Sequence, residues 1–240
     1  MSGLNVEQIA VLNDNYIYLL TCTETGKIAV VDPAVHAPVI EVLGNRQLDY
    51  IFNTHHHADH TGGNLALKEK YGCTIIGAKN DAARIPGIDQ TVSEGDVVAL
   101  GVQKAQVYET PGHTLGHIIY HFESNHALFC GDTLFAGGCG RLFEGSPEQM
   151  FQSLQKIKAM PDDTQVYCAH EYTLQNYKFL HQAAPENTTV QKRLSAVEQM
   201  RAAHQRTVPS LLAEEKKSNL FLTAPNTKAF AELRKAKDNF

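Results

Sequence analysis

The hydrophobic positions of the first 170 residues fall in short runs separated by turn residues, which is typical of a mixed α/β body. Asn13-Asp14-Asn15 and Thr25-Gly26 separate the first three apolar segments and predict turns. Helical spacing appears at 36–43, 64–71 and 147–160. The strands predicted from the remaining runs are 6–12, 16–21, 27–31, 50–54, 73–77, 97–100, 103–110, 117–122, 127–130 and 165–169.

The pattern changes near residue 170. No further alternating run follows Glu171, whereas helical spacing recurs at 173–183, 189–206, 209–217 and 227–237. We therefore expect two domains, an α/β domain over residues 1–170 and a helical C-terminal domain over residues 171–240. A length of 240 residues suits one main domain with a smaller companion.

The composition says more about the cellular compartment of the protein than about its fold. Hydrophobic residues make up 43% of the chain and charged residues 20%, as in soluble globular proteins. The longest apolar run, residues 16–20, is far shorter than the roughly 18 residues that cross a bilayer. Residues 1–12 lack the basic and apolar regions of a signal peptide, and the five cysteines form no CxxC pair. We expect a cytoplasmic protein with reduced thiols, neither secreted nor in a membrane.

Charge is unevenly distributed along the chain. Residues 1–191 carry 11 Lys and Arg against 21 Asp and Glu, whereas residues 192–240 carry 10 against 5. A basic tail on an acidic body is consistent with capture of nucleic acid or of a small anion. The net charge of −5 and the lack of a concentrated basic run argue against nucleic acid as a partner.

Histidine is the residue type that most strongly indicates a functional site in this sequence. The chain has twelve histidines, four of them in the segment Thr54-His-His-His-Ala-Asp-His-Thr-Gly-Gly63. The cluster follows a predicted strand and therefore lies in a loop at a strand end. Alternate residues of an extended segment point the same way, so His55 and His57 can bind one metal ion. Asp59 and His60 lie beyond the turn and can reach a second ion. The position between predicted core elements and the interleaved Asp favour a metal site over a solvated histidine run.

Three more candidate ligands occupy the same context, at or just after the end of a predicted strand. They are His113 in Thr-Pro-Gly-His-Thr-Leu-Gly-His, Asp132 in Cys-Gly-Asp-Thr, and His170 after Val-Tyr-Cys-Ala. Loops at one end of a rigid sheet are where such sites are usually built. His56 and His117 lie inside the motifs, but we expect His56 to point away from the ion and His117 to make a supporting hydrogen bond.

These motifs resemble those of the metallo-β-lactamase superfamily, whose metal signature is HxHxDH followed by a distant His, Asp and His. Three further segments resemble the glyoxalase II family of hydroxyacylglutathione hydrolases: residues 131–145, 168–173 and 233–240, the last reading Leu-Arg-Lys-Ala-Lys-Asp-Asn-Phe. The resemblance covers nearly the whole chain. It implies an α/β fold in which two β-sheets pack face to face with helices outside, an αββα sandwich, with a helical C-terminal domain.

The resemblance also implies the cofactors and their ligands. Two divalent metal ions per chain are expected, with zinc as the first choice and iron or manganese as the alternatives, all compatible with mixed nitrogen and oxygen ligands. Asp132 would bridge the two ions. The other ligands would form two triads: His55, His57 and His113 for the first ion, and Asp59, His60 and His170 for the second.

The implied activity is hydrolysis of S-D-lactoylglutathione to glutathione and D-lactate, the second step of methylglyoxal detoxification. A hydroxide shared by the two ions would attack the thioester carbonyl, and Asp59 and Asp132 would be the catalytic carboxylates. The thiolate leaving group has a conjugate-acid pKa of about 8.5, so no strong general acid is required. A route through a histidine-activated Cys or Ser is disfavoured because nothing around the cysteines demands it. We expect a monomer.

Glutathione carries two carboxylates and one ammonium, so its site should supply cations. The contacts that the resemblance implies are Arg141, Phe143, Tyr172, Arg234 and Lys237. Arg234 and Lys237 are three residues apart and would share one helix face. Phe143 stands where many members have Tyr, and residues 219–223 lack the Pro and Arg of the family's Asn-Pro-Phe-Leu-Arg segment.

Two kinds of alternative remain at this point. Another enzyme of the same fold, such as an iron-dependent persulfide dioxygenase, a β-lactamase or a nuclease, would share the metal signature. The dioxygenase would use a single iron, so metal content and oxygen consumption distinguish it. A binding module with a structural metal is the other class, but structural sites are usually closed and rich in thiolates. Seven His and Asp ligands favour an open, catalytic site.

Overall fold

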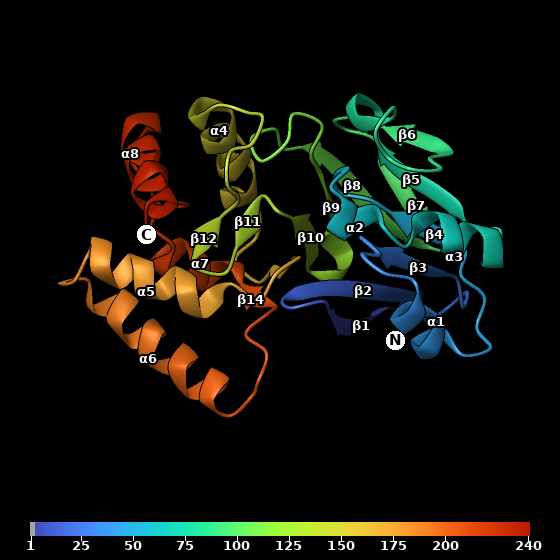
Figure 1. Cartoon of the computed structure of the whole chain (residues 1–240), viewed down its shortest axis with the longest axis horizontal. Coiled ribbons are helices and arrows are strands. Elements are labelled where there is room, and N and C mark those ends of the chain that lie inside the picture. The colour runs from blue at the N-terminus through green and yellow to red at the C-terminus, as the bar shows by residue number, and fades with distance from the viewer. Residues whose placement is uncertain (1–2) are drawn as a thin grey trace.

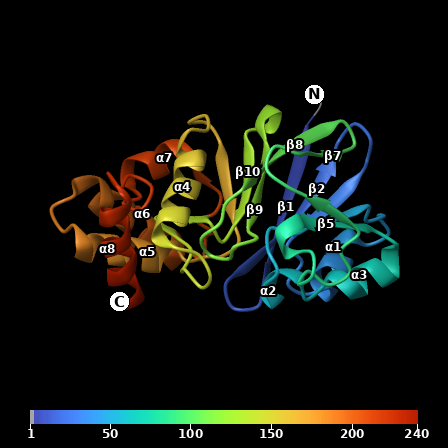
Figure 2. The same ribbon diagram turned by 90° about the horizontal axis from the view of Figure 1, so that it is seen from above.

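Two six-stranded β-sheets pack face to face in the computed structural model, which describes residues 3–240 (Figures 1 and 2). Helices cover the outer faces of the sheets, and four more helices form the C-terminal end of the chain. The predicted αββα sandwich with a helical C-terminal region is confirmed. Met1 and Ser2, the start of the N-terminal segment discussed above, lie outside the described residues.

The first sheet is antiparallel at its start and parallel thereafter. Alternate residues of its second strand pack on opposite faces: Leu19 contacts the core beneath the outer helices, and Tyr18 contacts the second sheet. Because both faces are buried, this strand is a continuous apolar run. In order across the sheet, the strands are β1 (Leu4–Val11), β2 (Asn15–Cys22), β3 (Ile28–Val31), β4 (Tyr50–Phe52), β5 (Thr74–Ala78) and β6 (Gln90–Val92). The helices on this side are α1 (Ala37–Leu43), α2 (Ala58–Thr61) and α3 (Asn64–Tyr71).

The second sheet has the order β14-β13-β10-β9-β8-β7 and is antiparallel except for the parallel pair β10 and β13. Its strands are β7 (Val97–Leu100), β8 (Gln103–Glu109), β9 (Ile118–Phe122), β10 (Ala127–Gly131), β13 (Gln165–Cys168) and β14 (Ser210–Leu211). A hairpin of β11 (Leu134–Phe135) and β12 (Gly138–Cys139) follows β10.

Helix α4 (Pro147–Lys158) begins with a capping box in which Ser146 and Gln149 bond each other's backbone N–H groups. It buries Met150, Leu154 and Ile157 in the main core. The C-terminal helices are α5 (Thr173–Ala183), α6 (Thr188–Ala202), α7 (Leu212–Ser218) and α8 (Thr227–Asp238). Within residues 3–240, none of the helices combines the length and the apolar character that crossing a membrane requires.

The structure differs from the sequence-based prediction at several short elements, including the unpredicted hairpin of β11 and β12. The helix predicted over 209–217 begins at Leu212, because Ser210 and Leu211 pair with β13. The C-terminal region, which has no alternating run, thus adds the two-residue edge strand β14 to the second sheet. A helical turn, α2, stands where a loop was expected, and β6 has no hydrophobic alternation to mark it.

Candidate metal centre

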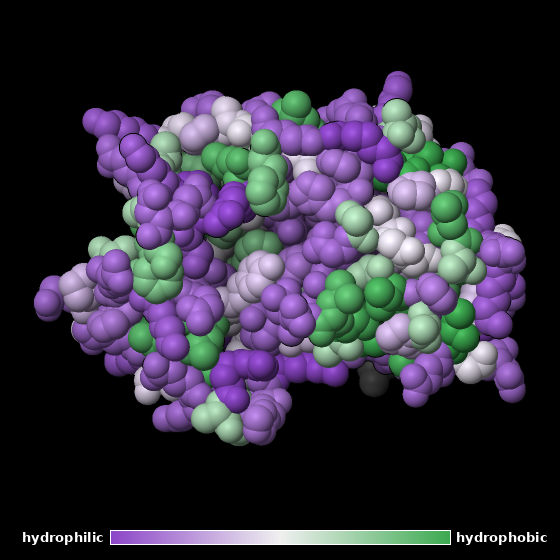
Figure 3. Space-filling view, in the orientation of Figure 1, coloured by the Kyte–Doolittle hydropathy of each residue, from purple (hydrophilic) through white to green (hydrophobic). Residues whose placement is uncertain are grey.

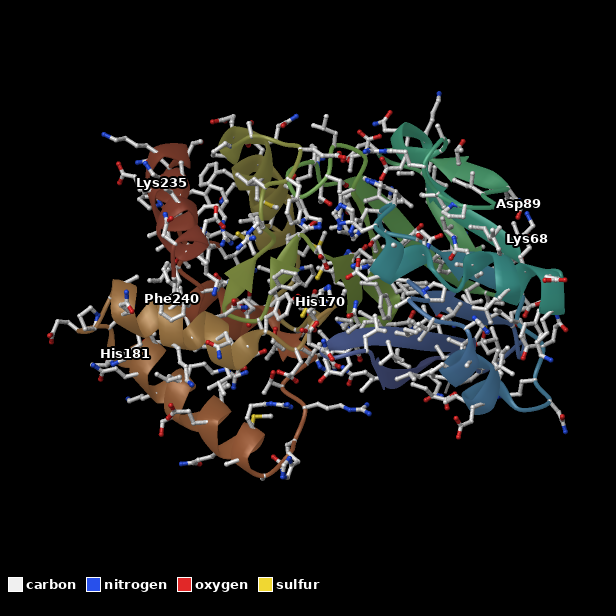
Figure 4. All side chains as sticks on the ribbon, viewed as in Figure 1. Lys68, Asp89, His170, His181, Lys235 and Phe240 are labelled. Atoms are coloured by element: carbon white, nitrogen blue, oxygen red, sulfur yellow. The ribbon has the colours of Figure 1, made fainter. Side chains whose placement is uncertain are left out.

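The predicted metal ligands converge at one end of the two sheets. His55 and His57 follow β4 of the first sheet. The other strands belong to the second sheet, where His113 follows β8, Asp132 follows β10 and His170 follows β13. Figure 4 places His170 near the middle of the molecule, where the sheets meet the C-terminal helices. The sheet ends thus bring together residues that are up to 115 positions apart in the sequence.

The first triad consists of His55, His57 and His113, whose candidate ligand atoms all lie within 4.8 Å of one another. Nδ1 of His57 lies 3.0 Å from Nε2 of His55 and 3.1 Å from Nε2 of His113. His55 is fully buried and His113 nearly so. Three ring nitrogens therefore point at one small volume, as the alternation of His55 and His57 predicted.

The second triad consists of Asp59, His60 and His170. Oδ2 of Asp59 lies 3.6 Å from Nε2 of His60 and 3.6 Å from Nε2 of His170. Asn15 donates from its side-chain nitrogen to Oδ2 of Asp59, which helps to fix this half-exposed carboxylate.

Asp132 lies between the triads and turns one oxygen to each. Its Oδ2 is 3.3 Å from Nε2 of His113 in the first triad. Its Oδ1 is 3.5 Å from Nε2 of His60 and 3.4 Å from Nε2 of His170 in the second. This is the arrangement that a bridging carboxylate needs.

The donor set fits a divalent metal. Ligand atoms about 2.0–2.2 Å from a common ion lie roughly 3.0–3.6 Å apart. The distances from His57 to His55 and His113, and from Asp59 to His60 and His170, fall in this range. Nε2 of His60 and Oδ1 of Asp132 are buried and have no hydrogen-bond partner among residues 3–240. Burying such atoms without a partner is unfavourable, and a metal ion between them would satisfy both. The His and Asp clusters therefore form a divalent metal site.

Outer hydrogen bonds orient the histidines toward this site. Nδ1 of His60 contacts Oδ2 of Asp32 at 3.0 Å, and Nδ1 of His170 contacts Oδ1 of Asp14 at 2.8 Å. Nδ1 of His113 donates to the backbone oxygen of Arg141 at 2.8 Å. When Nδ1 holds the proton, the lone pair of Nε2 is available to a metal.

The sequence reading missed Asp14 and Asp32. Asp32 is buried directly after β3 and also accepts from the backbone N–H of Thr54, at 2.8 Å, so it ties β3 to the histidine loop. It contacts His60 at the ring nitrogen opposite the one that faces Asp132, so we assign it a supporting role rather than a ligand role. The available signal was an acidic residue directly after a short apolar strand, the same context as Asp132.

The electrostatics of the two triads differ. Burial lowers the pKa of His55, His57 and His113, so these rings are neutral at pH 7. Burial also disfavours a charged His170, but the carboxylates of Asp132 and Asp14 outweigh it and raise its pKa to about 9. The neutral rings of the first triad thus have lone pairs available to a metal ion. In the second triad, the positive charge of His170 balances the nearby carboxylates of Asp132 and Asp14.

Close packing fixes the backbone before Asp132. Gly131 has φ +47°, and a Cβ there would lie 2.4 Å from Oγ1 of Thr54, so only glycine fits. Nε2 of His117 accepts from the backbone N–H of Asp132 at 3.1 Å. Burial lowers the pKa of His117 well below its usual value, consistent with this acceptor role. His117 therefore supports Asp132, as expected.

His56 also lies as expected, turned away from the triads. Its Nδ1 contacts Oδ2 of the fully buried Asp81 at 3.0 Å. Arg84 joins Asp81 to Glu144, whose Oε2 also accepts from the backbone N–H of Leu115 at 2.7 Å. This network links the histidine loop to the loops that carry His113 and Phe143.

A cavity of about 800 Å³ opens beside the metal ligands. Figure 3 shows the hollow on the face toward the viewer, between the C-terminal helices and the sheets. The structure brings all of the predicted substrate contacts to its lining: Arg141, Phe143, Tyr172, Arg234 and Lys237. His57, Asp59, Asp132 and His170 line the same cavity, so metal ligands and cations share one space.

The cations of the cavity differ in how they are held. Arg234 is buried; it donates to the backbone oxygen of Cys139 and to Oδ1 of Asp238, both at 2.9 Å. Nε of Arg141 lies 3.4 Å from the same Asp238 oxygen. Asp238 therefore joins the loop after β12 to α8. Lys237 is half-buried, and no carboxylate of residues 3–240 lies within 4.0 Å of its ammonium.

Aromatic rings frame the metal ligands. The exposed Phe143 ring packs edge-on against His113, with centroids 5.1 Å apart. Tyr172 stacks on His170 with centroids 4.7 Å apart and the ring planes nearly parallel. Both rings also line the cavity beside the metal ligands.

Fold and site together define a metallo-β-lactamase superfamily enzyme, and residues 12–170 match the Metallo-beta-lactamase superfamily. Residues 171–240 match the Hydroxyacylglutathione hydrolase C-terminus. The chain therefore belongs to the hydroxyacylglutathione hydrolase family, a family of hydrolases, as the glyoxalase II motifs indicated.

Full-length relatives agree. The chain is 51% identical to the hydroxyacylglutathione hydrolase of Rhodospirillum rubrum over 100% of both proteins. It is 48% identical to that of Methylococcus capsulatus over 99% of both. Among solved structures, ETHE1 from Myxococcus xanthus superposes with a TM-score of 0.75 at 28% identity, over 96% of this chain and 90% of that one.

Proposed function

We propose that this protein hydrolyses S-D-lactoylglutathione, and related 2-hydroxyacyl thioesters of glutathione, to glutathione and the free hydroxy acid. The observation that carries the proposal is the single cavity that joins two metal-binding triads to Arg141, Arg234 and Lys237. In a glutathione thioester, the thioester group would lie at the metal-binding triads and the carboxylates would lie at these three cations. The names of the full-length relatives support the same substrate class.

The residues that would hold two divalent ions are the two triads with Asp132 between them. Two ions at these positions would make water a nucleophile at neutral pH and polarise the thioester carbonyl. Asp59, anchored by Asn15, would orient the attacking water through its second oxygen. The neutral rings of the first triad, the one carboxylate of the second and Asp132 between them would together give mixed nitrogen and oxygen ligands suited to zinc, our first choice, and to iron or manganese.

The other residues bind and orient the substrate. Tyr172, held against His170, would donate its hydroxyl to the glutathione backbone, and Phe143 would pack on the ligand without donating a hydrogen bond. Arg141, Arg234 and Lys237, at the end of the cavity away from the metal ligands, would bind the glutathione carboxylates. This binding would position the thioester carbon beside the metal ligands. No residue needs to protonate the leaving group, because a thiolate leaves readily.

We further propose that the protein acts as a cytoplasmic monomer. All five cysteines are free and buried, which suits a reducing compartment. We also retain a division of the chain near residue 170, after the last strand that carries a metal ligand.

The test is hydrolysis of S-D-lactoylglutathione by the purified protein, with metal content measured on the same sample. Release of free thiol by protein containing close to two metals per chain supports the proposal. Two metals without thiol release would overturn the substrate but not the metal site. One iron per chain with consumption of oxygen would favour a dioxygenase instead.

A further inference from the structure

The ammonium group of Lys237 is surrounded by aromatic rings rather than by carboxylates. Its Nζ lies 5.2 Å from the ring centroid of Phe179, on α5, and 5.7 Å from that of Phe240. The two rings contact each other with centroids 5.5 Å apart and planes inclined at 66°. We call Phe179 and Phe240 the aromatic seat.

Three other lysines of this protein are held by carboxylates instead. Lys27, Lys156 and Lys216 each have a carboxylate within 2.9 Å. Lys237 has no such partner among residues 3–240, although Asp238 follows it directly. The carboxylate of Asp238 is taken by Arg234 and Arg141 instead. Among the three Lys and Arg side chains that line the cavity, Lys237 is therefore the one without a carboxylate partner in the described residues, and it is the one on the aromatic seat.

This difference has a chemical consequence. A carboxylate beside Lys237 would neutralise its charge and compete with an anionic substrate for its N–H donors. A ring face attracts the ammonium through its quadrupole but accepts no strong hydrogen bond. The donors of Lys237 therefore stay available to the cavity, which both Lys237 and Phe240 line.

We propose that Phe179 and Phe240 are positioning residues that hold Lys237 as an open receptor for a carboxylate of glutathione. The inference rests on the proposed function. It adds Phe179 and Phe240 to the substrate-binding site, although neither side chain is charged or forms hydrogen bonds. Phe179 is buried and fixes the inner side of the seat; Phe240 is 52% exposed and closes its outer side. Figure 4 shows Phe240 beside α5, and both Phe240 and His170 line the cavity.

The experiment compares Phe240→Leu with Phe240→Tyr in the metal-loaded enzyme. Because Phe240 is half-exposed, neither change threatens folding. Loss of an exposed cation–π contact corresponds to about a 2- to 5-fold effect on binding, so we expect Phe240→Leu to raise KM by that factor. Phe240→Tyr retains the ring and should retain the KM. kcat and metal content should not change in either variant.

A double-mutant cycle and a matched control sharpen the test. In a Lys237→Met background, Phe240→Leu should raise KM no further, because the ring then has no cation to hold. Tyr71→Leu removes a ring beneath another lysine, Lys70, whose ammonium lies 5.6 Å from it on α3. That variant should leave KM unchanged.

Three results would overturn the proposal: an unchanged KM in Phe240→Leu, an equal increase in Phe240→Tyr, or an undiminished increase in the Lys237→Met background. Failure of the proposed function looks different. It would appear as wild-type protein that releases no thiol, and calorimetric binding of S-methylglutathione to the same variants would then still test the seat.

Discussion

The two ends of the cavity are built in opposite ways. At the metal end, the nitrogen and oxygen donors are mostly buried, and the ring nitrogens of His60, His113 and His170 that face away from the triads have acceptors. At the far end only Arg234 is buried and hydrogen-bonded, whereas Lys237 contacts aromatic rings and Arg141 is largely exposed. Chemistry at a carbonyl needs donors fixed within a fraction of an ångström, whereas a carboxylate can be bound by cations that still move.

This contrast predicts a division of labour. Changes at the metal end should lower kcat and metal content. Changes at the far end should raise KM and leave the metals in place. Each variant below tests one side of that division.

The largest effect is expected for Asp132→Ala. If Asp132 bridges two ions, its loss removes a ligand from each of them, and it leaves His60 and His170 without the carboxylate that both now face. Hydrolysis should fall below detection, and metal content should fall toward one ion or none, as measured by elemental analysis of the purified variant. Full activity with full metal content would contradict the ligand assignment.

The next effect is expected for the outer carboxylates, in Asp14→Asn and Asp32→Asn. Each change keeps the shape but weakens the hydrogen bond that orients His170 or His60. Loss of such partners typically costs about 10- to 100-fold in metal affinity or activity. Competition with a chelator measures the affinity.

The matched control is Asp163→Asn, which alters an exposed His–Asp pair with His126 away from the cavity. It should leave metal affinity unchanged. Unchanged affinity in Asp14→Asn and Asp32→Asn as well would mean that the triads are held by the fold alone.

The sequence predicted the metal end better than the outer partners. The two triads could be predicted because HxHxDH places four candidate ligands within six residues, and because the three distant candidates all follow the end of a predicted strand. Asp14 and Asp32 are single acidic residues near turns, and which of many such residues meets a histidine depends on how β2 and β3 pair. That pairing is a long-range property of the sheet.

The far end was predictable only through family resemblance. Nothing in the spacing of Phe179 and Phe240, 61 positions apart, indicates that α5 and α8 meet there. The short edge strand β14 could not be predicted for a similar reason. β14 has two residues, and its hydrogen bonds to β13, rather than its own pattern, define it as a strand.

An effect confined to binding, with no loss of metal, is expected for Lys237→Met. Hydrogen bonds to charged groups contribute about 1.5–3 kcal/mol, so KM should rise about tenfold or more while kcat and both metals are retained. Steady-state kinetics with S-D-lactoylglutathione measures the KM. Lys235→Met is the control, because Lys235 lies on α8 but outside the cavity lining. A fall in kcat with unchanged KM would move Lys237 from the binding end to the chemistry.

The smallest effect is a pH dependence of KM that originates at Lys237. Burial, together with the nearby charge of Arg234, lowers the pKa of Lys237 to about 8, against the opposing effect of Asp238. Cys139, the other titratable group facing it, stays a neutral thiol because burial raises its pKa to about 11. Above pH 8 the ammonium therefore loses its proton, and KM should rise as the receptor for the carboxylate becomes neutral.

Lys237→Arg isolates this titration, since a guanidinium stays charged throughout the range. Its KM should be flatter than that of the wild type between pH 7.5 and about 9. The amino group of glutathione titrates equally with both enzymes and cancels in the comparison. Identical KM profiles would show that the binding end does not depend on the charge state of Lys237, and the contrast between the two ends would then rest on Arg141 and Arg234 alone.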